Sequence, residues 1–136
     1  MLKLIIGVKG TGKTKTLIEM VNQTTEASKG SVVCLERGVK LRYDIKHRTR
    51  LINTNDYLIF DAQSLFGFIA GLLASNHDIT DLFVDSALKI CNEDITAFEK
   101  LLIELDELAE KHGTNVVMTA SLPVEEASDI VNKYTK

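Results

Sequence analysis

The sequence is poor in the residues that mark several classes of protein. Its 136 residues include no tryptophan, one proline and two cysteines, Cys34 and Cys91, which form no CxxC pair. Two isolated cysteines exclude a disulfide framework and a zinc-finger pattern, so we expect buried, reduced thiols. One proline beside 45% hydrophobic and 26% charged residues is typical of a folded globular protein and excludes a disordered one.

Long apolar runs and an excess of positive charge are also missing. The longest apolar stretch, 65–74, is about half as long as a membrane span requires, and the first residues do not form a secretory leader. The formal net charge of −3 excludes a protein that coats nucleic acid through bulk positive charge. We therefore expect one domain, residues 1–136, in the cytoplasm.

Apolar strands alternate with helical segments along most of the chain. Strands are expected at 2–6, 31–36, 82–84 and 116–119. Helices are expected at 13–28, 62–75, 92–112 and 124–134, with Asn92 as a cap and Pro123 in the first turn of the last helix. This alternation predicts an α/β fold, with a mainly parallel sheet of about four strands and helices on both faces.

Residues 37–55 interrupt the alternation because they show no helical period. Leu41, Tyr43 and Ile45 alternate with polar residues, and a second apolar pair, Leu51 and Ile52, follows. This pattern predicts a small β-hairpin, with antiparallel strands, inserted in the domain.

The most informative residues follow the first expected strand. Gly7-Val8-Lys9-Gly10-Thr11-Gly12-Lys13-Thr14 fits the Walker A pattern G-x-x-x-x-G-K-S/T without exception. The glycines let main-chain N–H groups point into a concave loop, and the helix that begins near Lys13 adds its positive end. Lys13 would reach the β- and γ-phosphates, and the Thr14 hydroxyl would bind Mg²⁺. The pattern predicts a site for the phosphates of a nucleotide.

On this loop and the alternation that follows it, the whole chain resembles the P-loop NTPases. It is most similar to their ASCE, RecA-like division and to small one-domain bacterial ATP-binding proteins. The resemblance implies a three-layer P-loop fold with strand order 1-4-3-2 and Mg²⁺–ATP at the carboxyl ends of the strands. Adenine is favoured because the guanine-recognition sequence N-K-x-D is missing.

The resemblance also implies an acidic residue that holds Mg²⁺ at the end of a second strand. Asp85 follows the expected strand 82–84 and takes this role. Asp61 follows the apolar run 58–60 and competes for it, but no helix precedes that run to supply a crossover. Asp61 is therefore interpreted as a helix cap.

Two further residues are assigned from the resemblance. Glutamate does not follow Asp85, so the catalytic base is assigned to Glu36, at the end of the second expected strand. A surface carboxylate paired with Arg37 or Lys40 is the alternative for Glu36. Thr119 resembles the polar residue that senses the γ-phosphate, with a helix cap as its alternative.

Charge is distributed unevenly along the chain. Residues 37–50 hold six basic residues against one acid, a net of +5, whereas 78–110 hold ten acids against two lysines, a net of −8. Three interpretations of the basic segment stay open. It is a solvated loop, it supplies an arginine to the γ-phosphate of its own or a neighbouring copy, or it binds single-stranded nucleic acid with Tyr43 stacking. The basic residues of the segment are Arg37, Lys40, Arg42, Lys46, Arg48 and Arg50, and the last four are the ones assigned to nucleic acid.

These features together predict Mg²⁺-dependent ATP binding and slow ATP hydrolysis, with self-association or a protein partner as a means of activation. Two alternatives stay open. The first is a module that binds ATP without hydrolysing it, because no glutamate follows Asp85. The second is a small-molecule kinase in which the basic segment holds the acceptor.

Overall fold

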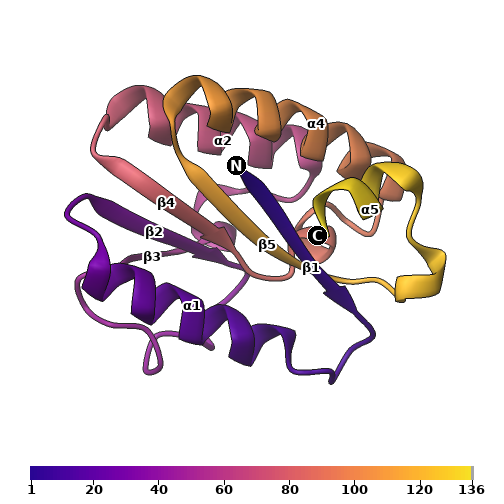
Figure 1. The fold of residues 1–136 in the computed structure, drawn as a ribbon, viewed down its shortest axis with the longest axis horizontal. Helices are drawn as coiled ribbons and strands as arrows, with labels where there is room; N and C mark the ends of the chain where they lie inside the picture. Colours follow the sequence, from indigo (N-terminus) through magenta and orange to yellow (C-terminus); the bar gives the residue numbers. More distant parts are fainter. Residues whose placement is uncertain (136) are drawn as a thin grey trace.

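The computed structural model describes residues 1–135 and contains a five-stranded sheet in which all neighbouring strands are parallel (Figure 1). The strands, in chain order, are β1 (Leu2–Gly7), β2 (Ser31–Glu36), β3 (Arg50–Asn53), β4 (Ile79–Val84) and β5 (Asn115–Ser121). They lie in the order β1-β5-β4-β2-β3. The order predicted for the four expected strands is confirmed, and β3 adds a fifth strand at the edge.

Helices cover both faces of the sheet, as the sequence predicts, and the strands are apolar because both of their faces are buried. They are α1 (Lys13–Ala27), α2 (Ala62–Ser75), α3 (Ala87–Ile90), α4 (Ile95–His112) and α5 (Asp129–Tyr134), with 3₁₀ turns at Thr54–Tyr57 and Val124–Glu126. In Figure 1, α1 lies below the sheet, and α2, α4 and α5 lie above it. Leu17 and Val21 of α1 pack against β2, β4 and β5, while Leu65 and Phe98 belong to the larger core on the opposite face.

The predicted antiparallel hairpin is wrong. Residues 37–49 form turns, and β3 then pairs in parallel with β2, with Val33 opposite Arg50 and Glu36 opposite Asn53. Leu41 and Ile45 are both buried in the core on the α1 side, and the Ile45 amide donates to the Leu41 carbonyl at 3.1 Å. Their spacing therefore reflects a loop that packs on one face of the sheet. This loop serves as the crossover, for which a helix is the usual choice.

Asp61 is a helix cap, as predicted. Its side chain accepts a hydrogen bond from the Ser64 amide at 2.8 Å, and the Ser64 hydroxyl accepts one from the Asp61 backbone amide at 3.2 Å. The run before it is not a strand, because Leu58 adopts a left-handed conformation, with φ 58°, at the end of a 3₁₀ turn.

Two predicted helix starts are wrong. Asp94, rather than Asn92, caps α4 and accepts a hydrogen bond from the Ala97 amide at 3.1 Å. Asn92 instead has a positive φ of 60°, in the loop before the cap. The final helix begins at Asp129 because Ser128 caps it, and Pro123 precedes only a 3₁₀ turn.

The expected burial of both cysteines is confirmed. Cys34 lies in β2 and Cys91 follows α3, and both are buried and free. Burial raises the pKa of the Cys91 thiol to about 12. Among residues 1–135, no helix combines the length and apolar character that crossing a bilayer requires.

Candidate functional site

The glycine-rich loop joins the carboxyl end of β1 to the start of α1, where its glycines are conformationally required. Gly10 and Gly12 have φ values of 87° and 85°, in the left-handed region that favours glycine. At Gly7 a Cβ would lie 2.7 Å from the Thr11 hydroxyl, so a larger residue would push against the loop. The sequence thus specifies a tight turn that ends at the N-terminus of a helix, a position where anions are bound readily.

Two side chains of the loop contact the same carbonyl. The Lys13 ammonium donates to the Val8 carbonyl at 2.9 Å, and the Thr11 hydroxyl donates to it at 2.7 Å. A lysine ammonium has three donors, so this bond leaves two of those of Lys13 for a ligand. Lys13 is therefore held over the glycine-rich loop.

Thr14, Asp85 and Thr119 come together from three different elements. The Thr14 hydroxyl lies 3.2 and 3.3 Å from the two carboxylate oxygens of Asp85. The Thr119 hydroxyl donates to Asp85 Oδ1 at 2.8 Å and accepts from the Ser86 amide at 2.8 Å. Asp85 follows β4 and is 8% exposed, and its carboxylate is held between Thr14 of α1 and Thr119 of β5.

The oxygen atoms at this position fit Mg²⁺, which prefers hard oxygen ligands. Within residues 1–135, no group of three or more His, Cys, Asp or Glu side chains could hold a metal. Mg²⁺ commonly binds one or two protein oxygens and completes its shell with phosphates and water. Thr14 and Asp85 match that mode, because each offers oxygen at the mouth of the glycine-rich loop.

Glu36 lies at the carboxyl end of β2 and is only 3% exposed. Its two oxygens accept the backbone amides of Lys40 and Leu41 at 3.1 and 3.0 Å. Burial raises the pKa of Glu36, and the negative charge of Asp85 raises it further, whereas the two backbone bonds oppose this shift. The alternative of a surface carboxylate is wrong, because Glu36 is buried and forms no ion pair with Arg37 or Lys40.

Most of these groups border one cavity of about 460 Å³ at the carboxyl ends of the strands. The predicted residues that line it are Lys9, Gly10, Gly12, Lys13, Thr14, Glu36, Asp85 and Thr119. Gly7, Val8 and Thr11 do not line it and instead shape the loop. The cavity is cationic, with six basic residues against three acids. The basic residues are Lys9, Lys13, Lys15, Arg37, Lys40 and Lys89.

Sequence reasoning missed Arg37 and Lys89 as residues of this cavity. The Arg37 guanidinium makes a long hydrogen bond of 3.4 Å to the Lys89 carbonyl, which links the end of β2 to α3. A signal was available for Arg37, because it directly follows Glu36 at the end of a parallel strand.

The cavity also contains strained backbone at Ser86 and Glu93, whose φ values are 56° and 59°. Such strain tends to gather at functional sites.

Arg48 and Arg50 lie outside this cavity. Arg50 begins β3 opposite Val33, three positions before the carboxyl end of that strand pair. Arg48 donates to the Ser28 carbonyl at the far end of α1. Neither side chain supplies a cation to the glycine-rich loop of its own chain, whereas Arg37, at the start of the same basic segment, lines the cavity.

No protein-family model matches the chain, and no curated protein matches it.

Proposed function

We propose that the protein binds Mg²⁺–ATP in the cavity at the carboxyl ends of the strands and hydrolyses it slowly. The observation that carries the proposal is the position of Lys13, Thr14 and Asp85. A glycine-rich turn, a lysine amine, a threonine hydroxyl and a buried carboxylate meet within one cavity. Each of these groups is of the type that phosphoryl transfer requires.

The binding step uses the backbone and Lys13. Main-chain amides of the loop and the positive end of α1 would bind the phosphate oxygens, and Lys13 would neutralise the β- and γ-phosphates. Thr14 and Asp85 would hold Mg²⁺, which supplies positive charge to the phosphate oxygens as the bond breaks. Thr119 positions Asp85 through the bond of 2.8 Å between them. The adenine preference rests on the missing N-K-x-D sequence.

The hydrolytic step assigns the base to Glu36. A water oxygen attacks the γ-phosphorus, the bond between γ-phosphorus and bridging oxygen breaks, and the water proton passes to Glu36. ADP and inorganic phosphate leave. A raised pKa makes Glu36 a better proton acceptor than an ordinary glutamate, which supports this role.

One observation favours binding without hydrolysis as the second candidate. Both oxygens of Glu36 already accept backbone amides, so the carboxylate is fixed to the loop 37–41. An ATP-binding module that signals through this loop needs no turnover. A small-molecule kinase is the third candidate. Of the basic segment 37–50 that would hold its acceptor, Arg37 and Lys40 line the cavity, whereas Arg48 and Arg50 lie outside it.

Calorimetric titration with Mg²⁺–ATP tests the proposal, with Lys13→Ala as the site variant and Lys100→Ala as the control. We expect Lys13→Ala to weaken binding by about tenfold to 100-fold, since charged hydrogen bonds contribute about 1.5–3 kcal/mol. Lys100 is exposed on α4, so its variant should bind normally. No binding by the unaltered protein at about millimolar ATP would contradict the proposal. Phosphate release then separates the hydrolase from the binding module.

A further inference from the structure

The strand β3 has one open side. It lies at the edge of the sheet and pairs only with β2. Within residues 1–135, no backbone group of Arg50–Asn53 makes a hydrogen bond to an element other than β2. An exposed edge of this kind is a template for an additional strand.

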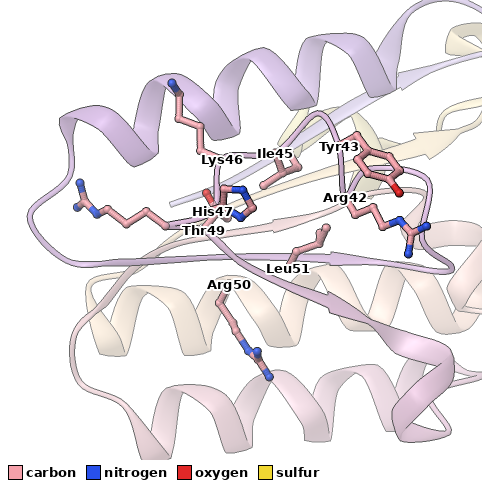
Figure 2. A pocket seen from close by; sticks show the side chains of 9 residues that line it. Arg42, Tyr43, Ile45, Lys46, His47, Thr49, Arg50 and Leu51 are labelled. Carbon is pink, nitrogen blue, oxygen red and sulfur yellow. The ribbon is translucent and has the colours of Figure 1, made fainter.

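A cavity lies on each face of this edge. The cavity on the α1 face has a volume of about 700 Å³ and contains Ile45 and Leu51, with Arg42 and Tyr43 on one side (Figure 2). The cavity on the α2 face has a volume of about 640 Å³ and is lined by apolar groups that include Ile52, Phe68 and Leu72. A strand placed beside β3 would direct alternate side chains into these two cavities.

The charge around the edge is positive. Residues 45–55 contain Lys46, Arg48 and Arg50 and no carboxylate. Lys46 is paired with Glu26 at 2.6 Å, so Arg48 and Arg50 carry the positive charge of this edge. Arg48 and Arg50 line both cavities, and the Arg50 side chain makes no hydrogen bond or ion pair with the described residues. In Figure 2 the Arg50 side chain points away from α1. A ligand that fits this edge therefore combines negative charge with apolar side chains.

We propose that an extended segment of another protein, with alternating acidic and apolar residues, adds to β3 as a sixth strand. A second copy of this chain fits poorly, because its acidic stretch 78–110 is folded into β4 and α4. Two-fold pairing of β3 with β3 would also bring Arg48 and Arg50 of both copies together. Nucleic acid is a poor ligand for this edge, because it has no apolar side chains to pack against the wall formed by Ile52, Phe68 and Leu72.

Fluorescence anisotropy with the full chain tests this proposal. The probe is a labelled peptide of about twelve residues in which glutamate alternates with valine. We expect binding at low ionic strength that weakens by about tenfold or more in the double variant R48E/R50E. The matched control, K100E/K111E, makes the same charge change on the exposed side of α4 and should bind as the unaltered protein does.

The backbone contribution is tested on the probe, so that no folding defect interferes. A peptide that is N-methylated at every backbone nitrogen cannot donate to the ladder along either edge, and we expect its binding to be lost. Equal binding of the methylated peptide would overturn strand addition. Absence of binding by the unmodified peptide at about millimolar concentration would also overturn it. So would binding of oligo-dT that depends on Tyr43 when the peptide does not bind. The peptide assay contains no nucleotide, so its failure is distinguishable from failure of ATP binding.

Discussion

The molecule has two regions rich in basic side chains, and they differ in what surrounds the charge. In the cavity at the carboxyl ends of the strands, two buried carboxylates, Glu36 and Asp85, lie beside the cations and are held by hydrogen bonds. At the β3 edge, Arg48 and Arg50 lie beside apolar walls and an open strand, and residues 45–55 contain no carboxylate.

This difference shows that a count of basic residues does not define a ligand. The first region combines inward-facing amides with oxygen groups for a metal, which suits a compact triphosphate. The second offers backbone hydrogen bonds along a line and pockets on alternate sides, which suits an extended chain. Changes in one region should therefore leave binding at the other intact.

The largest effect is expected for Glu36→Gln. If Glu36 accepts the proton of the attacking water, its loss should lower the rate of phosphate release by about 100-fold or more. ATP affinity and peptide binding at β3 should not change. Single-turnover phosphate release, beside calorimetry, measures both quantities. Glu107→Gln, on the exposed side of α4, is the control, and an unchanged rate in Glu36→Gln would contradict the assignment.

An intermediate effect is expected for Asp85→Asn. An amide cannot hold Mg²⁺ as a carboxylate does, so Mg²⁺ should no longer strengthen ATP binding, and affinity should fall by about tenfold. Titrations with and without Mg²⁺ measure this difference. The variant should still bind the peptide. Retained Mg²⁺ dependence would show that another group holds the metal.

The same variant tests the electrostatic coupling of the two carboxylates. Burial and the charge of Asp85 raise the pKa of Glu36 in the folded protein. Protonation of Glu36 therefore stabilises the folded protein relative to the unfolded chain. This stabilisation is fully present below the ordinary pKa and is lost as pH rises through the raised value. The free energy of unfolding should therefore fall across that window, and fall less in Asp85→Asn. Urea unfolding between about pH 4 and 7 measures the slope. Equal slopes in both proteins would contradict the coupling.

The smallest effect is expected for Asn53→Ala. The native Asn53 side chain connects the two regions. Its side-chain oxygen accepts the amides of Gly38 and Asn55 at 2.9 and 3.0 Å, and so ties the end of β3 to the loop after Glu36. Its loss should lower the free energy of unfolding by about 0.5–1.5 kcal/mol. Asn53→Asp keeps the acceptor and should lose less. Urea unfolding compares the two, and equal losses would contradict the role of these bonds.

Some parts of the fold and the site were predicted correctly from the sequence because the residues that determine them are close together in the chain. The loop Gly7–Thr14 is continuous, and its glycine positions specify the turn without reference to the remainder of the chain. Asp85 was found because it ends an apolar run that follows a helix. The strand order, by contrast, came from the resemblance to P-loop NTPases.

Other parts could not be predicted because they depend on which face of the sheet a segment covers. The spacing of Leu41 and Ile45 fits a hairpin strand and also a loop packed on α1, and only tertiary packing distinguishes them. Arg37 and Lys89 are far apart in the chain and meet because β2 and β4 are neighbours in the sheet. Because the first of these segments was assigned to a hairpin, the parallel pairing of β3 with β2 was not predicted.

The sequence by itself determined the turn at residues 7–14, the apolar strands and the helix cap at Asp61, because each depends on backbone preferences and side chains a few residues apart. Only the tertiary structure decided that Glu36 is buried beside Asp85 and that β3 has an open edge with a cavity on each face. Those properties arise from contacts between segments that are far apart in the chain. Such segments come together only when the whole sheet is packed.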